Sequence, residues 1–301
     1  MRLDYHILDV FTHEAFAGNP LAIVLDADGL STARMQAVAR EFNLSETVFV
    51  FAPRDPVNSA RLRIFSPTRE LPFAGHPTIG AAVLLGLLRA GEYLAREDVG
   101  IVLEEPIGPV RCTVRRLKGH ARASFTLPQL PASAGPDPDP QALAAALGVA
   151  PADIGFDDHA PTLFSAGVGF TFVPLADRAA VTRAAPDLAH WDAIGPADHP
   201  AAFVYTRDVA RRGGAFHARM FAPSMGIAED PATGSAVAAL AGALMRFEGL
   251  ADGDHTFIIE QGFAMGRPSL ITLGLDVAGG VLTAASIGGA AVMAAQGVIE
   301  A

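Results

Sequence analysis

The pattern of hydrophobic and polar positions predicts alternating strands and helices. In the first half of the chain, apolar runs rich in β-branched and aromatic residues predict strands at 5–11, 47–52, 60–65, 110–117 and 121–127. Apolar residues also recur at intervals of three and four at Met35, Val38, Ala39 and Phe42. This spacing predicts an amphipathic helix over 31–42 with Ser31 as its N-cap.

The second half gives the same kind of pattern. Strands are expected at 169–175, 201–206, 215–221, 256–261, 269–275 and 281–287. Strand content is therefore high, and helices lie between the strands. The fold class expected from this pattern is α+β.

Two segments are apolar around the whole circumference of a helix. They are TIGAAVLLGLL, which begins at Thr78, and ATGSAVAALAGALM, which begins at Ala232. A helix that is apolar on every side must be buried on every side. We therefore expect one central helix wrapped by sheet in each half.

The chain also repeats itself. AGNPLAIVL at 17–25 is echoed by AGVGFTFVPL at 166–175, and RIFSPTRELPFAGHPTIGAAV at 63–83 by RMFAPSMGIAEDPATGSAV at 219–237. In the second pair Arg63 matches Arg219, and His76-Pro77 matches Asp230-Pro231. Two related halves are expected, joined by the proline- and glycine-rich segment 128–140.

Composition narrows the class of protein. The 301 residues suffice for two domains, and a formal net charge of −10 disfavours nucleic acid as a partner. No apolar stretch approaches the roughly 20 residues that a membrane span needs, and the N-terminus does not resemble a signal peptide. The lone Cys112 is expected to be a buried small hydrophobe. A soluble, cytoplasmic protein is predicted.

Both buried helices are preceded by an ionisable residue and a proline. Because proline favours the first helical position, His76 and Asp230 are expected at the two helix caps. Free N–H groups and the positive end of the helix dipole gather there. If the halves face each other across a cleft, the two helix starts suit a small carboxylate-bearing substrate whose carbanion or enol needs stabilisation without a metal.

Four motifs occur in order along the chain: GNPLAIV at 18–24, NLSET at 43–47, ELPFAGHPT at 70–78 and EDPATGSA at 229–236. Together they resemble the PhzF-like family of phenazine-biosynthesis isomerases. The resemblance implies a diaminopimelate-epimerase-like fold of two pseudosymmetric domains, a homodimer and no cofactor. With the C-terminal segment returning to the first domain, the domains are expected at 1–128 plus about 287–301, and at 129–286.

The resemblance also implies roles for particular residues. In the phenazine enzyme of this family the substrate is dihydro-3-hydroxyanthranilate, and the glutamate of the NLSE motif, here Glu46, shuttles a proton between two ring carbons. His76 and Asp230 are assigned to binding and orienting the substrate. The pocket is expected to be lined by Gly75, Gly234 and Ser235. As a general base, Glu46 is expected to lie in a partly apolar pocket.

Other chemistries lack sequence support. The nine histidines show no metal-ligand spacing, and GVGF at 167–170 is not a dinucleotide fingerprint because a strand follows it. No GxSxG motif is present, which disfavours a serine hydrolase. No metal site is predicted.

Two alternative functions stay open at this point. One is an amino-acid epimerase or racemase on the same fold, whose known members use two cysteines where this chain has His76 and Asp230. The other is a non-catalytic protein that binds a small anion or a partner. A buried Glu46 favours the enzyme, whereas a Glu46 facing bulk solvent favours the binder.

Overall fold

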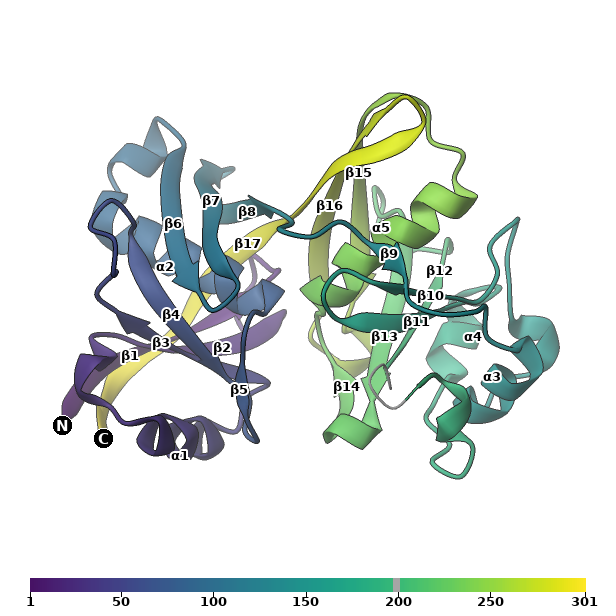
Figure 1. Ribbon diagram of the computed structural model, residues 1–301, viewed down its shortest axis with the longest axis horizontal. Coiled ribbons are helices and arrows are strands. Elements are labelled where there is room, and N and C mark those ends of the chain that lie inside the picture. Colours follow the sequence, from purple (N-terminus) through teal and green to yellow (C-terminus); the bar gives the residue numbers. More distant parts are fainter. Residues whose placement is uncertain (197–200) are drawn as a thin grey trace. The chain divides into compact units, whose positions relative to one another are not determined.

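The computed structural model describes residues 1–196 and 201–301, which form two compact units (Figure 1). Unit 1 comprises Met1–Thr126 and Gly288–Ala301, and unit 2 comprises Leu127–Ile287. Each unit is built mainly from strands and contains one long buried helix. The predicted α+β class is confirmed.

Unit 1 contains ten helices and strands and the second part of the last strand. They are β1 (Arg2–Val10), β2 (Asn19–Val24), α1 (Thr32–Phe42), β3 (Glu46–Phe51), β4 (Ala60–Phe65), β5 (Glu70–Leu71), α2 (Gly75–Ala90), β6 (Val99–Glu105), β7 (Gly108–Leu117), β8 (His120–Thr126) and β17 (Val281–Glu300). The predicted cap of α1 is confirmed, because the Arg34 N–H donates to Ser31 Oγ at 3.2 Å.

Unit 2 includes the predicted linker segment 128–140 and contains the first part of β17. Its elements are β9 (Ala132–Ser133), α3 (Pro140–Leu147), β10 (Thr162–Ser165), β11 (Gly169–Pro174), α4 (Arg178–Arg183), β12 (Ala202–Thr206), β13 (Phe216–Ala222), β14 (Ile227–Asp230), α5 (Gly234–Phe247), β15 (Gly253–Gln261) and β16 (Ser269–Ala278). Within the linker segment β9 pairs with β10. The predicted strands are present with ends shifted by a few residues, except that the strand expected at 281–287 continues as β17 to Glu300. No element was predicted at β6, β10, α3 or α4, nor at the short strands β5, β9 and β14.

Both units use one pairing scheme. In unit 1, β2 is parallel to β3, β3 antiparallel to β4, β4 parallel to β6, and β6 antiparallel to β7. In unit 2 the same relations join β11, β12, β13, β15 and β16 in order. The two units are therefore pseudosymmetric, as predicted.

The two apolar helices are buried, as their composition predicts. Every residue of α2 from Gly75 to Gly86 is buried, and the helix packs against β1, β2, β3, β6, β7 and β8. In α5, Gly234 and all residues from Ala236 to Leu244 are buried, and the helix packs against β10, β11 and β16. None of the helices in the described ranges has both the length and the apolar character required to span a bilayer.

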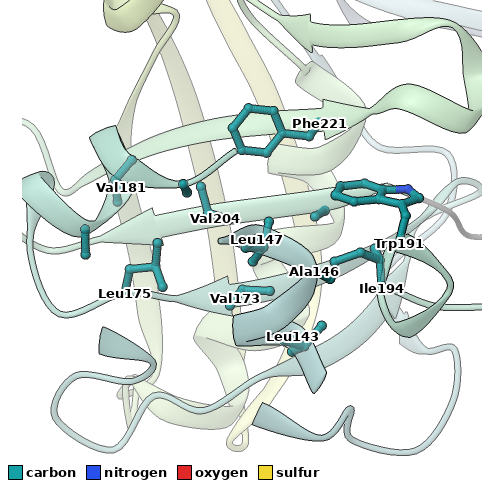
Figure 2. Close-up of a cluster of buried hydrophobic side chains, with 13 residues drawn as sticks. Leu143, Ala146, Leu147, Val173, Leu175, Val181, Trp191, Ile194, Val204 and Phe221 are labelled. Carbon is teal, nitrogen blue, oxygen red and sulfur yellow. The ribbon is translucent and has the colours of Figure 1, made fainter. Parts of the chain in front are cut away.

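A second hydrophobic layer covers part of the sheet in unit 2. Figure 2 shows Leu143 and Leu147 of α3 and Val181 of α4 with Val204 and Phe221 of the strands. Unit 1 has a comparable cluster, in which the amphipathic α1 packs through Met35 and Ala39. These layers keep β3, β4, β12 and β13 covered by protein.

The predicted helix starts are wrong in detail. Helix α2 has Ala74 as its N-cap, so His76 is its second residue and Pro77 its third. Helix α5 has Thr233 as its N-cap, and Asp230 is the last residue of β14, paired with Met220. Proline is tolerated anywhere in a first turn, where N–H groups have no helical partner, and also in extended chain, so it did not mark the first position here.

The structure matches the two copies of the repeat differently from the residue-by-residue comparison of 63–83 with 219–237. Arg63 makes two hydrogen bonds to Glu70, and Arg219 makes the same two bonds to Glu229. Arg63 lies on β4 and Glu70 on β5. In the same way, Arg219 lies on β13 and Glu229 on β14.

Once these ion pairs are matched, other equivalences follow from position along the chain. The proline equivalent to Pro231 is Pro72 rather than Pro77. His76 then corresponds to Ser235, and Leu71 corresponds to Asp230.

The close packing of α5 makes a testable prediction. A Cβ added at Gly242 would lie 2.3 Å from Cδ1 of Phe164, which comes from the neighbouring β10. Gly242→Ala should therefore destabilise the protein by about 1–3 kcal/mol, despite a gain in helix propensity of about 1 kcal/mol. The change can be measured by urea denaturation.

Gly100→Ala is the matched control, because Gly100 is exposed on β6 and a Cβ there would meet nothing within 4 Å. The control should change stability by no more than about 1 kcal/mol. Equal denaturation midpoints for Gly242→Ala and the wild type would contradict the packing of α5 against β10.

Candidate active site

Unit 1 brings Glu46 and His76 together. Glu46 is the first residue of β3 and follows the turn at Asn43, whose left-handed backbone (φ 52°) ends α1. His76 lies in the first turn of α2, which packs against β3. Glu46 Oε2 is 3.2 Å from His76 Nε2, and the two side chains are 15% and 6% exposed.

The environment of this pair sets its charge state. Burial lowers the pKa of the His76 imidazole to about 3, since the charged form loses its hydration. The imidazole is therefore neutral near pH 7, and the contact joins a carboxyl group to a neutral ring rather than to an imidazolium. The two atoms are not aligned as a hydrogen bond. A shielded carboxyl group next to a neutral imidazole is suited to proton transfer.

Asp230 lies in unit 2 within a buried hydrogen-bond network. Its carboxylate accepts a 2.5 Å hydrogen bond from the hydroxyl of Thr233, the N-cap of α5. Gln261 Nε2 donates to Thr233 Oγ1 at 2.9 Å and to the Asp230 carbonyl at 2.8 Å, while Gln261 Oε1 accepts from the Thr233 N–H at 3.0 Å. Asp230 is 6% exposed, so the network fixes its position.

The other predicted site residues occupy helix starts. Gly75 and Gly234 are the first residues of α2 and α5 and are buried. Ser235 is the second residue of α5 and is half-buried, in the position that His76 has in α2. First-turn N–H groups lack helical partners and can bind an anion. That both helix starts serve one cleft stays a prediction.

Several polar residues near these helix starts were missed by the sequence analysis. Thr78 and Glu105 accompany the start of α2, and Thr233 and Gln261 accompany the start of α5. The strand register reveals one pair of them, since it places Glu104-Glu105 opposite Glu260-Gln261.

Glu105 is a buried carboxyl group with a raised pKa. It is the last residue of β6 and is 6% exposed. Burial raises the pKa of its carboxyl group to about 8. Burial together with the nearby Glu105 raises the pKa of the Cys112 thiol to about 12. Both groups are therefore mostly protonated near pH 7.

In the described ranges, 1–196 and 201–301, no three His, Cys, Asp or Glu side chains are grouped so that they could hold a metal ion.

Comparison with known proteins assigns the chain to a family. The family model described as "Phenazine biosynthesis-like protein" matches residues 8–297. An uncharacterized isomerase of Mesorhizobium japonicum is 51% identical over 299 residues, which cover 98% of this chain and 97% of the relative. The chain belongs to the phenazine biosynthesis-like family, and the resemblance drawn from its motifs is confirmed.

The relatives also identify the class of reaction. The trans-2,3-dihydro-3-hydroxyanthranilate isomerase of Pseudomonas chlororaphis is 33% identical over 295 residues, with 98% of each chain covered. Since both of these curated relatives are named as isomerases, the protein is an isomerase, as predicted.

Solved structures support the fold. A phenazine biosynthesis protein of the PhzF family from Bacillus anthracis matches with a TM-score of 0.88 at 23% identity, with all of both chains covered. A hydroxyproline epimerase from Agrobacterium vitis matches with a TM-score of 0.62 at 14% identity, covering 99% of this chain and 92% of the epimerase. The epimerase-like fold is therefore confirmed.

The raised pKa of the buried Glu105 predicts how the stability of the protein depends on pH. The folded-state pKa of Glu105, about 8, lies above its ordinary value of 4.5. Between these values the folded state retains a proton that the unfolded state has lost. The free energy of unfolding should therefore fall with rising pH by about 1.4 kcal/mol per unit from this one group. Glu105→Gln should remove this slope.

The pH dependence of stability that comes from Glu105 is best measured between pH 6.5 and 8. His76 contributes the opposite slope between about pH 3 and 6.5, because its folded-state pKa is lowered. Denaturation midpoints converted to free energies at three pH values would measure the slope. Glu92→Gln, at an exposed acid, is the control and should behave as the wild type does. Parallel slopes for the wild type and Glu105→Gln would contradict a protonated Glu105.

Proposed function

We propose that this protein is a cofactor-independent isomerase that moves a proton on a small carboxylate-bearing metabolite resembling dihydro-3-hydroxyanthranilate. The observation that carries the proposal is the contact between Glu46 and His76, in which a largely buried carboxyl group lies 3.2 Å from a neutral imidazole. The name of the Pseudomonas chlororaphis relative supports the substrate class.

In the proposed reaction Glu46 begins as a carboxylate. It removes a proton from one carbon of the substrate, and the electron pair of the broken C–H bond moves into the neighbouring conjugated system. Glu46, now protonated, delivers the same proton to another carbon, so the double bonds shift and the atoms and electrons balance. Such positioned acid–base catalysis typically contributes about 10²–10⁴ in rate.

Negative charge develops on the substrate between the two proton transfers. The N–H groups at the start of α2 and the dipole of this helix can stabilise that charge. The neutral His76 can donate one hydrogen bond to the substrate without adding a charge. These groups are fixed by the buried first turn and need little reorganisation.

We propose that unit 2 supplies substrate recognition. The Asp230 carboxylate is held by Thr233 and can accept hydrogen bonds from an amino or hydroxyl group of the substrate. Gly234 and Ser235 begin α5, where backbone N–H groups and a hydroxyl can bind the substrate carboxylate. Asp230 is thus assigned to orientation, and Glu46 to proton transfer.

A two-cysteine racemase is disfavoured by the only cysteine of the chain. Cys112 is buried on β7, and its raised pKa of about 12 keeps the thiol protonated. The non-catalytic binder remains the competing function, and the low exposure of Glu46 favours the enzyme. The family resemblance further supports a homodimer, a cytoplasmic location and activity without a metal as parts of this proposal.

The proposal predicts the effect of removing the proton carrier. Glu46→Gln should lower kcat/KM for dihydro-3-hydroxyanthranilate by about 10²–10⁴, because an amide cannot take the proton. In the wild type slow exchange at Glu46 should compete with proton return, so the partial solvent deuterium incorporation that proton NMR detects in D₂O should also be lost in the variant. The control is Glu41→Gln, at an exposed acid five residues earlier, which should retain wild-type activity.

Binding of the substrate without turnover by the wild type would contradict the enzyme and support the non-catalytic binder. Full activity of Glu46→Gln would instead show that another group carries the proton.

A further inference from the structure

Equivalent strand ends in the two units carry an acid and an amide of nearly the same shape. The register pairs Arg61 with Glu104 in unit 1 and His217 with Glu260 in unit 2. Glu105 therefore corresponds to Gln261. Both are buried at the end of their strand, and both contact a threonine at the start of the central helix.

In unit 2 the direction of hydrogen bonding is set by chemistry. An amide N–H₂ only donates and a carboxylate only accepts. The hydroxyl of Thr233 therefore accepts from Gln261 Nε2 and gives its own hydrogen to Asp230. A neutral donor at the end of β15 thus begins a relay that ends on a predicted site residue.

In unit 1 the same counting bears on the state of Glu105. Thr78 Oγ1 lies 2.8 Å from the carbonyl oxygen of Ala74 and 2.8 Å from Glu105 Oε1. The hydroxyl has one hydrogen and the carbonyl can only accept, so that hydrogen can be aligned with one of the two oxygens but not fully with both. If Glu105 carries a proton on Oε1, it donates to Thr78 and both contacts become full hydrogen bonds.

The alternative is a buried carboxylate with little compensation. Glu105 Oε2 makes no hydrogen bond within the described part of the chain. An ionised carboxylate that is 6% exposed and accepts only one hydrogen bond would be costly. A protonated acid avoids this cost and lets the Ala74 carbonyl keep its bond to Thr78.

We propose that Glu105 is a positioning residue that acts as a protonated carboxylic acid. It donates to Thr78, and Thr78 donates to the carbonyl of Ala74, so the turn that carries Gly75 and His76 is fixed next to Glu46. This role rests on the proposed function, in which His76 belongs to the active site. Gln261 has the corresponding role toward Asp230.

The surroundings of Glu105 are compatible with this state. The elements packed against β6 are α2, β4 and β7. Their buried titratable groups are His76 and Cys112, both neutral near pH 7. On β4, Arg61 lies over the ring of Phe51, and Arg63 binds Glu70. The cations of β4 are thus directed to other partners.

The protonation state can be measured without any substrate. In protein labelled with ¹³C at glutamate carboxyl carbons, the Glu105 signal is assigned by its loss in Glu105→Gln. It should report a protonated acid at pH 6.5 and titrate with a midpoint near 8. A carboxylate signal at pH 6.5 would overturn the proposal, whatever the enzyme turns over.

The positioning role is tested by activity. Glu105→Gln should keep kcat/KM within about threefold, since an amide can donate as Gln261 does, whereas Glu105→Leu and Thr78→Val should lower kcat by roughly tenfold. The ring signals of His76 should shift in the latter two variants and remain in place in Glu105→Gln. Any loss of wild-type activity above pH 8 should be smaller in Glu105→Gln.

Equal activity of Glu105→Leu and Glu105→Gln would overturn the relay and reduce Glu105 to a packing residue. If the wild type fails to convert dihydro-3-hydroxyanthranilate, the proposed function fails, while the carboxyl titration and the His76 signals still decide the relay. The two failures are therefore distinguishable.

Discussion

The structure depends on one constraint: α2 and α5 start inside the protein, so the polar groups of their first turns must find partners there. A helix leaves its first four N–H groups unbonded, and water cannot supply partners at buried positions. In unit 1 the Thr78 hydroxyl contacts the Ala74 carbonyl and Glu105 at the start of α2, and in unit 2 Gln261 Oε1 accepts from the Thr233 N–H at the start of α5. The first-turn N–H groups are the ones proposed to bind the substrate.

The same scaffold carries different chemistry in the two units. His76 corresponds to Ser235, and Leu71 corresponds to Asp230. Glu46, which precedes Thr47, corresponds to Ala201, because Thr47 pairs with Phe65 as Ala202 pairs with Phe221. The proposed proton carrier and its histidine therefore belong to unit 1, and the carboxylate proposed to orient the substrate belongs to unit 2. In this proposal, divergence between two pseudosymmetric halves has given proton transfer to unit 1 and substrate orientation to unit 2.

Much of the fold could be predicted from the sequence because it follows from local pattern. The all-apolar helices had to be central, and the period-two strands had to form sheet. The ends of α2 and α5 could not be predicted, because proline is compatible with several positions in a first turn and with extended chain. The ladder that pairs Asp230 with Met220 is a nonlocal contact that a local pattern does not contain.

The residues of the candidate site could be proposed in part for a similar reason. The motifs around Glu46, His76 and Asp230 are contiguous in sequence, so they could be recognised by resemblance. Glu105 and Gln261 act through contacts 27 and 28 residues away, with Thr78 and Thr233. Their importance depends on burial and on hydrogen counting, which need coordinates.

The central claim is that one shielded carboxyl group, Glu46, carries the proton from one carbon to another. The most direct measurement uses dihydro-3-hydroxyanthranilate deuterated at the carbon that loses its hydrogen, converted in ordinary water under single-turnover conditions. The account predicts that part of the deuterium appears at the new carbon of the product, because a largely buried carboxyl group exchanges slowly with solvent. Complete loss of the deuterium to water, with undiminished turnover by Glu46→Gln, would contradict it.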